Sequence, residues 1–439
     1  MKDWFLLRFP GGGVDDRSMM RTLLLATLGL ALAGHVSAND WPSWRGPASD
    51  GTLPADAEYP EEWSATDKLR WRVEMPGPGN SSPIVVGEKV FLTQAVDGGK
   101  TRSLRCLSAE DGKTLWEKDI DYGKTDPTHR TNPYSAASPV SDGNLVFAWH
   151  GNAGLHAYDL EGNERWSRDL GSDYAHQWGP NAASPVLHGD KLIVHAGPGT
   201  SVALFCLDKA SGETIWSKDL PEATSKDSKE FKGSWATPLL VENAGRTEML
   251  VGLPGSLRSF DPDTGEELWR CGGLSDLCYT NPIVGEDFAV YLCGYGGPGM
   301  GMKLPAAGET GDLTDSHRLW VDQGNKRNRQ RIGTGQLVDG YLYQLDEPGV
   351  AVCLDPRTGE KIWEERLGRK SWSSMNLVGG KLYVNDQSGT TFVIDPDPEG
   401  LRVVSRNPVD PDQHTNATPA FARGSVFLRT EAFLYAFGE

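Results

Sequence analysis

The sequence has little positive charge, few cysteines and almost no long apolar run. Its 439 residues include 43 Lys and Arg against 60 Asp and Glu, which gives a formal net charge of −17. Such an acidic chain repels the phosphates of nucleic acid and of anionic membrane surfaces, so neither is expected as a partner. Hydrophobic residues make up 38% and charged residues 23% of the chain, which is typical of a globular protein.

Signatures of common enzyme and metal chemistry are also missing. The sequence contains no Gly-x-Ser-x-Gly, no P-loop and no His-Glu-x-x-His motif. It contains no Cys-x-x-Cys pair, and no metal site is predicted. Cys106, Cys206 and Cys353 occupy equivalent places in three repeats and are therefore expected to be buried thiols far from one another. Cys271, Cys278 and Cys293 could contain one disulfide, and Cys271–Cys278 is the favoured pair.

One short apolar run lies near the N-terminus. Arg21 precedes apolar residues 22–33, and Val36-Ser37-Ala38 has the small-x-small pattern of a cleavage site. This pattern predicts a Sec-type signal peptide within residues 1–38, cleaved near Ala38, and a periplasmic or secreted protein. Residues 1–18 precede Met19 and are interpreted as an over-extended start. No transmembrane segment is expected in the mature chain, because the run is too short to span a bilayer.

Glycine and proline, in contrast, are plentiful. The chain has 52 Gly and 28 Pro, which indicates many short elements and argues against a helical bundle. A Gly-x-x-x-Trp motif recurs after a turn, and Trp320 ends a longer version of it. The turn often reads Asp-Pro-x-Thr-Gly between segments of alternating apolar and polar residues, which predicts a β-hairpin. The copies with the four-residue gap are Gly112…Trp116, Gly162…Trp166, Gly212…Trp216, Gly265…Trp269 and Gly359…Trp363.

A second motif, two small residues followed in most copies by proline, opens each repeat. An apolar strand follows it, and then a tight turn and another strand, so each repeat contains four short antiparallel strands. Repeats of this kind predict an all-β, eight-bladed β-propeller, and residues 39–439 are expected to form it as a single domain. The eight copies begin at Ser81, Ala137, Ala183, Ala236, Thr280, Gly333, Ser373 and Ala417.

The two ends of the repeat region complement each other. The last repeat stops at residues 434–439 without a fourth strand, and an unpaired strand of the missing kind occupies residues 69–74. This N-terminal strand carries Trp71 in register with Trp116. We therefore expect residues 69–74 to complete the last blade and close the ring, which removes free sheet edges.

The Leu-Asp-x-x-Thr-Gly-x-x-x-Trp unit resembles the repeat of the PQQ-like eight-bladed propellers. This family includes quinoprotein alcohol dehydrogenases, and non-catalytic members such as BamB of the outer-membrane assembly machine. Residues 41–47, Trp-Pro-Ser-Trp-Arg-Gly-Pro, are similar to the start of many exported propellers of the family. The resemblance implies a structural role, docking on the neighbouring blade, for Trp71, Trp116, Trp166, Trp216, Trp269, Trp320 and Trp363.

The same resemblance raises the question of a cofactor. In the family's enzymes, PQQ and Ca²⁺ lie over the channel, and many of these enzymes carry a disulfide between adjacent cysteines. The present sequence has no adjacent cysteine pair and lacks the long insertions that build a lid. No cofactor is therefore expected, and PQQ with Ca²⁺ is kept as the alternative.

Loops that precede the inner strands of a propeller converge at one mouth of its channel, and here they are rich in aromatic, Arg, Asn and His side chains. Such side chains can stack on a ligand and form hydrogen bonds with it. Arg329 and Arg331 could hold an anion or pair with local acids. No catalytic residue is assigned. The candidate ligand-binding residues of this funnel are His129, Arg130, Asn132, His176, Trp178, Asn181, Trp235, Asn281, Arg329, Arg331, Trp372, His414 and Asn416.

The sequence thus favours an exported, monomeric, non-catalytic scaffold that binds an envelope protein or a small ligand at its funnel face. A PQQ- and Ca²⁺-dependent dehydrogenase is the first alternative. A carbohydrate- or peptide-binding module that uses the funnel aromatics is the second.

Overall fold

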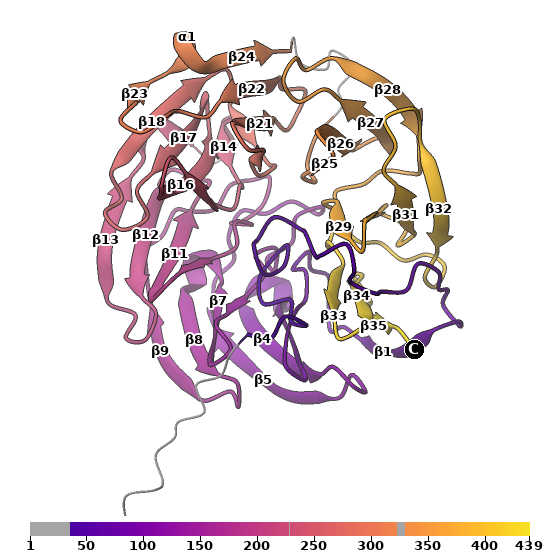
Figure 1. The fold of residues 1–439 in the computed structure, drawn as a ribbon. Coiled ribbons are helices and arrows are strands. Elements are labelled where there is room, and N and C mark those ends of the chain that lie inside the picture. The colour runs from indigo at the N-terminus through magenta and orange to yellow at the C-terminus, as the bar shows by residue number, and fades with distance from the viewer. Residues whose placement is uncertain (1–35, 228, 323–329) are drawn as a thin grey trace, which may run out of the picture. The chain divides into compact units, whose positions relative to one another are not determined.

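The computed structural model describes residues 36–227, 229–322 and 330–439 of the chain. Its strands form eight sheets with a core of four antiparallel strands each, and these sheets follow one another around a ring (Figure 1). The structure confirms the predicted eight-bladed β-propeller. We number the blades 1 to 8 from the first inner strand, β2.

The first four blades use consecutive strands. In blade 4 a fifth strand, β23 (Gly311–Asp312), pairs in parallel with β18. Blade 1 contains β2 (Ile84–Val86), β3 (Lys89–Val96), β4 (Thr101–Ser108) and β5 (Thr114–Asp121); blade 2 contains β6 (Val140–Ser141), β7 (Leu145–Trp149), β8 (Leu155–Asp159) and β9 (Glu164–Arg168). Blade 3 contains β10 (Val186–His188), β11 (Lys191–Ala196), β12 (Ala203–Asp208) and β13 (Thr214–Asp219); blade 4 contains β15 (Leu239–Asn243), β16 (Arg246–Leu253), β17 (Ser256–Phe260) and β18 (Glu267–Gly272).

The remaining blades continue the same order until the last. Blade 5 contains β20 (Ile283–Val284), β21 (Phe288–Leu292), β22 (Gly299–Lys303) and β24 (Arg318–Val321); blade 6 contains β25 (Gln336–Val338), β26 (Tyr341–Asp346), β27 (Val350–Leu354) and β28 (Lys361–Arg366). Blade 7 contains β29 (Asn376–Val378), β30 (Lys381–Asn385), β31 (Thr391–Asp395) and β32 (Arg402–Asn407); blade 8 contains β33 (Ala420–Ala422), β34 (Ser425–Arg429), β35 (Phe433–Phe437) and β1 (Leu69–Glu74).

Blade 8 joins the two ends of the propeller. Strand β1 pairs antiparallel with β35, and Leu69 lies opposite Phe437 while Glu74 lies opposite Phe433. The predicted closing strand is confirmed with the bounds that the sequence suggested. A short parallel pair, β14 (Gly233–Ser234) and β19 (Leu277–Cys278), links the loops that precede the inner strands of blades 4 and 5.

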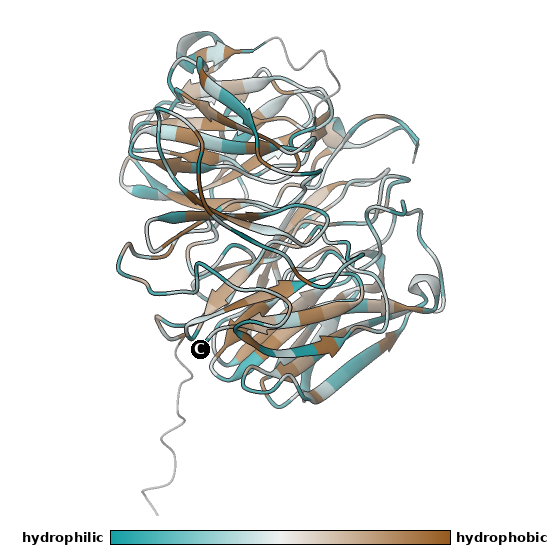
Figure 2. Cartoon of the chain, turned by 90° about the vertical axis from the view of Figure 1, so that its right-hand side faces the viewer, coloured by the Kyte–Doolittle hydropathy of each residue, from teal (hydrophilic) through white to brown (hydrophobic). Residues whose placement is uncertain are grey.

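The hydrophobic core lies between adjacent blades rather than at one centre. One cluster joins Phe91 and Cys106 of blade 1 to Val146 and Tyr158 of blade 2, and similar clusters fill the next interfaces. Hydrophobic residues accordingly gather in the strands, while the connecting loops are more hydrophilic (Figure 2). Helical segments are short, such as α1 (Thr314–His317), and in the described residues none has the length and apolar character that a membrane-crossing helix needs.

The Gly-x-x-x-Trp motif links each blade to the next. The glycine of a turn has a positive φ, and its Cα lies against the tryptophan of the preceding blade; a Cβ on Gly212 would lie 2.6 Å from the Trp166 ring. The indole N–H of most repeated tryptophans also donates to a backbone carbonyl in that next turn. These bonds run from Trp71 to Ala109 (3.0 Å), Trp116 to Leu160 (3.0 Å), Trp166 to Lys209 (2.9 Å), Trp216 to Pro262 (3.1 Å), Trp320 to Pro356 (2.9 Å) and Trp363 to Asp397 (3.0 Å).

Trp269 departs from the hydrogen bonding of the other repeated tryptophans. Its indole N–H donates to Glu248 of its own blade at 2.6 Å. The reason is local: in blade 5 the short turn is replaced by a long connection that carries β23 and α1, so the usual acceptor carbonyl is not provided. Glu248 is fully buried and is also bound by Arg246 and Ser259.

Blade 7 has Val404 where the other blades have tryptophan. Blade 8 offers no turn to receive an indole there, because its third and fourth strands, β35 and β1, come from opposite ends of the repeat region. Trp63 occupies this interface instead. Its ring stacks on Phe437 at 5.5 Å, and its backbone N–H donates to Asn407 of blade 7 at 3.0 Å.

All six cysteines are buried and free. The expectation of buried thiols for Cys106, Cys206 and Cys353 is confirmed. The candidate bridge between Cys271 and Cys278 is not formed: the Cys271 thiol lies 3.9 Å from the sulfur of Met300.

Candidate functional site

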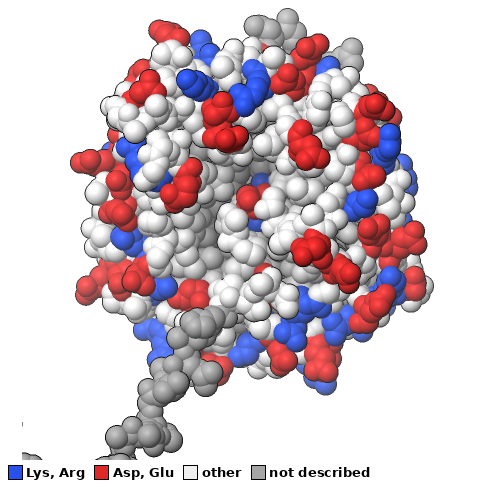
Figure 3. Space-filling model, in the orientation of Figure 1, with Lys and Arg blue, Asp and Glu red and all other residues white. Residues whose placement is uncertain are grey.

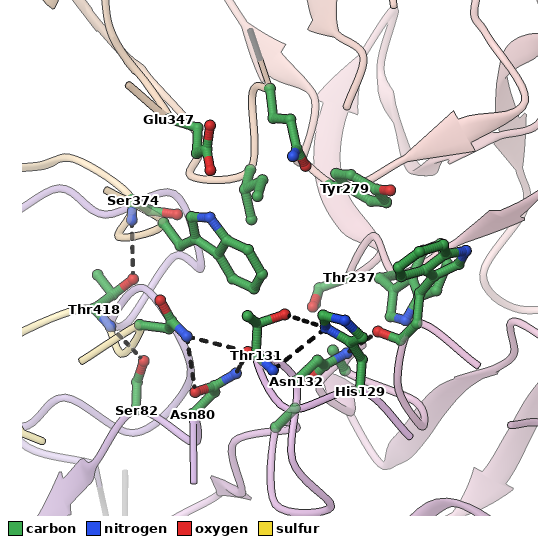
Figure 4. Close-up of a pocket in the computed structure, with 18 of the residues that line it drawn as sticks. Asn80, Ser82, His129, Thr131, Asn132, Thr237, Tyr279, Glu347, Ser374 and Thr418 are labelled. Carbon is green, nitrogen blue, oxygen red and sulfur yellow. Dashed lines mark hydrogen bonds between the residues drawn. The ribbon is translucent and has the colours of Figure 1, made fainter. Parts of the chain in front are cut away.

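A closed ring of hydrogen bonds surrounds the channel where the inner strands begin. In every blade, the second residue of the small–small motif donates its backbone N–H to the side-chain oxygen of the equivalent residue in the next blade. Two of these bonds, from Ser374 to Thr418 and from Thr418 to Ser82, are drawn in Figure 4. The eight donors, with the distance to the next residue, are Ser82 (2.9 Å), Ser138 (3.0 Å), Ser184 (3.0 Å), Thr237 (3.1 Å), Asn281 (2.9 Å), Thr334 (3.0 Å), Ser374 (3.1 Å) and Thr418 (2.9 Å).

The small–small motif therefore joins neighbouring blades at the wall of the channel. A short hydroxyl or amide side chain provides the acceptor, and the proline that follows in most copies keeps this residue extended. We call this set of eight residues the throat ring. Because each of its members is buried, the ring leaves few polar groups of the wall free for a ligand.

The segment 40–52 crosses the channel, and we call it the plug (Figure 1). Trp41 pairs with Val85 of blade 1, and the carbonyl of Pro42 accepts from Ser141 of blade 2 at 2.9 Å. Three residues later, the Arg45 guanidinium donates to Gln336 of blade 6 at 2.9 Å. Blades 2 and 6 lie opposite each other in a ring of eight, so the chain from Pro42 to Arg45 passes across the axis.

Arg45 fastens the plug from within the protein. The side chain is buried, and its Nη2 also donates to the carbonyls of Gly335 and Met375 at 3.3 and 2.9 Å. Burial lowers the pKa of Arg45 to about 10, an effect that the charge of Asp50 opposes. At neutral pH the guanidinium is charged; Nη2 donates to three oxygens, whereas the buried Nε has no hydrogen-bond partner.

A pocket of about 390 Å³ lies between the plug and the loops that precede the inner strands. Its volume is in the range of small-ligand sites. Phe231 and Tyr295 are 53% and 45% exposed and lie at its open side, whereas Trp235 is 7% exposed. The aromatic residues that line it are Trp44, Trp178, Phe231, Trp235, Tyr279, Tyr295 and Trp372.

The polar part of the lining is almost uncharged. Glu347 and Lys370 are the charged residues among the described lining, and they form an ion pair of 3.0 Å with each other. Asn80, Asn132 and Thr131 lie along one side of the pocket (Figure 4). Charged side chains elsewhere gather around the rim of the face seen in Figure 3, and the hollow near the axis is mostly uncharged.

Six of the residues predicted from the sequence line this pocket. The His129 Nδ1 lies 2.7 Å from the Thr131 hydroxyl, and the His129 ring lies 5.2 Å from Trp178. Trp235 contacts Tyr279 edge to face at 5.2 Å. The six residues are His129, Asn132, Trp178, Trp235, Trp372 and Asn416.

Three other candidates have structural partners instead. The His176 imidazole is buried, and its Nε2 bonds the carbonyl of Glu230 at 2.7 Å; burial lowers its pKa. The Asn181 amide donates to the carbonyl of His195 at 2.8 Å, and its oxygen accepts from Ala183. Asn281 is a member of the throat ring.

Among the described basic candidates, Arg130, Arg331 and His414 do not line the pocket. Arg130 is exposed and does not line the pocket, and His414 lies 3.1 Å from Glu431. Arg331 pairs with Asp322 at 3.2 Å and with Asp346 at 3.6 Å, so it follows the alternative of pairing with local acids. Arg329 lies outside the described residues.

Several lining residues escaped the sequence prediction. Trp44 comes from the plug, and Glu347 comes from the turn after the second strand of blade 6 rather than from a loop before an inner strand. Lys370 lies two residues before the predicted Trp372, but a lone lysine gives no signal. Trp44 belongs to the Trp-Pro-Ser-Trp-Arg-Gly-Pro segment of residues 41–47, but the sequence does not indicate that this segment reaches the axis of the propeller.

Comparisons with known proteins agree with this architecture. A family model described as outer membrane protein assembly factor BamB matches residues 61–204, 175–291 and 310–434. The chain is 22% identical to BamB of Moranella endobia over 72% of this chain and 64% of that protein. It is 24% identical to polyvinylalcohol dehydrogenase of Sphingopyxis sp. (strain 113P3) over 55% of this chain and 41% of that protein. The chain thus spans less than two thirds of the length of both relatives.

Solved structures show the same fold at low identity. BamB from Moraxella catarrhalis superimposes with a TM-score of 0.57 at 16% identity, covering 84% of this chain and 96% of that one. The quinohemoprotein alcohol dehydrogenase from Comamonas testosteroni gives 0.63 at 11% identity, covering 92% and 81%. Together with the family model, which matches most of the sequence, they place the chain in the PQQ-like, BamB-type family of β-propellers.

Proposed function

We propose that this chain is an exported, non-catalytic binding protein that takes a small ligand into the pocket between its plug and the loops that precede the inner strands. The observation that carries the proposal is an aromatic pocket of about 390 Å³ whose channel is crossed by the plug. Such a pocket favours a bound ligand over passage through the ring. Export rests on the predicted signal peptide and on the BamB relatives, and the envelope is the proposed location.

The first alternative, a PQQ-dependent dehydrogenase, has sequence relatives but lacks a suitable donor set. PQQ is a tricarboxylate, and carboxylates need cationic partners. The described lining offers Lys370, already paired with Glu347, and Arg331 is paired with Asp322 and Asp346. Within residues 36–227, 229–322 and 330–439, no three His, Cys, Asp or Glu side chains cluster as cation ligands. The described residues do not fit PQQ and Ca²⁺.

A direct test compares two probes on purified residues 39–439. The uncharged dye N-phenyl-1-naphthylamine, which brightens in apolar pockets, is expected to bind saturably. PQQ, with or without Ca²⁺, is expected to show no saturable quenching of tryptophan fluorescence. Substituting Trp372→Ala should weaken dye binding about tenfold, because a ring of the wall is lost.

Arg130→Ala is the matched control, because Arg130 is exposed in a funnel loop but does not line the pocket. Dye binding that is equal in Trp372→Ala and Arg130→Ala would contradict a pocket site. Ca²⁺-dependent PQQ binding followed by reduction of a dye acceptor would favour the dehydrogenase instead.

A further inference from the structure

We infer that the pocket binds an uncharged saccharide, which contacts the aromatic walls and the indole of Trp44 in the plug. The inference rests on the proposed function and adds the ligand class. It uses three properties of the described lining: its rings, its amide side chains and its charge.

The rings come from separate parts of the chain and meet around one space. Trp178 lies 5.3 Å from Phe231 at 55°, and Trp235 lies 5.2 Å from Tyr279 at 73°. Tilted and edge-to-face contacts give the walls ring surfaces of several orientations. A saccharide has C–H faces that stack on such surfaces, and hydroxyl groups around its edge.

Polar groups of the lining match those hydroxyls. Three pocket tryptophans, Trp178, Trp235 and Trp372, have buried indole N–H groups without a hydrogen-bond acceptor. Trp63 and Trp149, which do not line the pocket, have the same property. Protein atoms cover all these N–H groups, so a pocket tryptophan would donate to a saccharide only if its ring shifts when the ligand binds.

Amides extend the same chemistry. Asn80, Asn132, Asn416 and Gln330 all line the pocket. Asn416 donates to Asn80, and Asn80, Asn132 and Asn416 each donate to a backbone carbonyl, so a ligand would use the N–H groups and lone pairs that these bonds leave over. The Glu347–Lys370 pair adds an acceptor and a donor with no net charge. Hydroxyl groups, which both donate and accept, suit this mixture better than groups that only accept or only donate.

Charge argues against the competing ligand classes. An anionic sugar or a phosphate would lose its hydration in the pocket without gaining a new partner. Lys370, the cation of the described lining, is already paired with the carboxylate of Glu347. A short free peptide would bring charged termini to the same surroundings. The neutral saccharide is therefore the class that the described residues favour.

Trp44 gives the plug a part in recognition. The chain crosses the axis between Pro42 and Arg45, which bind opposite blades, and Trp44 lies within this crossing and lines the pocket. Trp41, in contrast, is 1% exposed and packs 5.5 Å from Phe421 in the core. The two tryptophans of the motif thus have separate duties: Trp41 anchors the plug, and Trp44 contacts the ligand.

The test is calorimetry and tryptophan fluorescence of purified residues 39–439 with neutral mono- and disaccharides, with glucuronate and with a neutral tripeptide. At least one neutral saccharide is expected to bind saturably, and glucuronate at least about tenfold more weakly than glucose or its dimers. Trp44→Ala should weaken saccharide binding about tenfold, and Trp44→Phe, which keeps an aromatic ring, should weaken it less. Circular dichroism checks that both variants are folded.

The outcomes separate the two proposals. If the naphthylamine dye binds and no saccharide does, or if the tripeptide binds better, the saccharide class is wrong and the pocket stands. If neither dye nor saccharide binds, both proposals fail. If saccharide binding is unchanged in folded Trp44→Ala, the role of the plug is overturned. Lys370→Met with Arg369→Met as its neighbouring control gives a second measurement, in which only Lys370→Met should weaken binding.

Discussion

Gly212 serves a turn and a blade interface at the same time. Its φ of +71° permits the hairpin turn, and the absence of a side chain admits the ring of Trp166 from the preceding blade. The same residue therefore sets both the local hairpin and the distance between blades 2 and 3. This double duty explains why glycine and tryptophan recur at a fixed spacing.

Substituting Gly212→Ala should lower the free energy of unfolding by about 2–4 kcal/mol, because the methyl group both strains the backbone and overlaps Trp166. Urea unfolding followed by circular dichroism measures the change. Gly189→Ala is the matched control: Gly189 has a φ of +57° in a hairpin turn of the same blade, and nothing lies within 4 Å of the position that an added Cβ would take. It should cost only about 1 kcal/mol. Equal losses at the two positions would argue against the interface role.

Individual residue types reveal less about the pocket than about the fold. His176, Asn181 and Asn281 look the same in the sequence as His129, Asn132 and Asn416. In the structure the last three line the pocket and the first three do not, although Asn132 and Asn416 also donate to backbone carbonyls. A sequence shows that a polar side chain is near the channel, but not whether it faces the pocket.

At the scale of the element, the throat ring couples the start of each inner strand to the next blade. All eight bonds run in one sense, from the backbone of one blade to the side chain of the next. Hydrogen bonds arranged in such a series strengthen one another. The repeated small–small motif could be read from the sequence, but this role could not, because it depends on where the neighbouring blade lies.

Removing one acceptor of the ring tests this coupling. Thr237→Val keeps the shape of the side chain but leaves the buried backbone N–H of Ser184 without its partner at 3.0 Å. The free energy of unfolding should fall by about 1–3 kcal/mol. Thr237→Ser retains the hydroxyl, so its loss should be clearly smaller. A Val variant as stable as the Ser variant would show that the ring bond contributes nothing measurable.

At the scale of the whole molecule, the described residues include four histidines whose pKa is lowered by burial: His150, His156, His176 and His195. In the unfolded chain they take up protons near pH 6.5. In the folded protein they stay neutral down to a lower pH. Between that lower pH and about pH 6.5, the unfolded state therefore binds more protons than the folded state. Stability therefore decreases as the pH falls below about 6.5, until the folded groups also protonate.

Urea unfolding at pH 7.5, 6.5 and 5.5 should accordingly show a progressive loss of stability. His195→Gln removes one of these groups while offering a donor to the carbonyl of Ala236, which lies 2.9 Å from His195 Nδ1. The variant should lose less stability between pH 7.5 and 5.5 than the unaltered protein. An identical pH dependence would mean that His195 takes up its proton equally in both states.

The arrangement of the propeller was predictable because it is repetitive. Eight motifs, seven tryptophans and an unpaired strand at residues 69–74 are local signals that add up along the chain. The exceptions were not predictable, because Trp269, Val404 and Trp63 follow from which turns exist in the neighbouring blade. The plug was likewise invisible, since no periodic pattern indicates a segment that crosses an axis.

The pairing of β1 with β35 has a consequence for the order of assembly. Leu69 and Phe437 lie opposite each other although almost the whole propeller separates them along the chain. During the proposed export, blades 1 to 7 can each form from strands that arrive together, but β1 must wait until the last segment has crossed the membrane. Until then β1 and its future partners present unpaired edges, the state most open to aggregation or to a chaperone. The propeller is thus protected from aggregation only when translocation of the whole chain is complete, because β1 cannot pair with β35 before then.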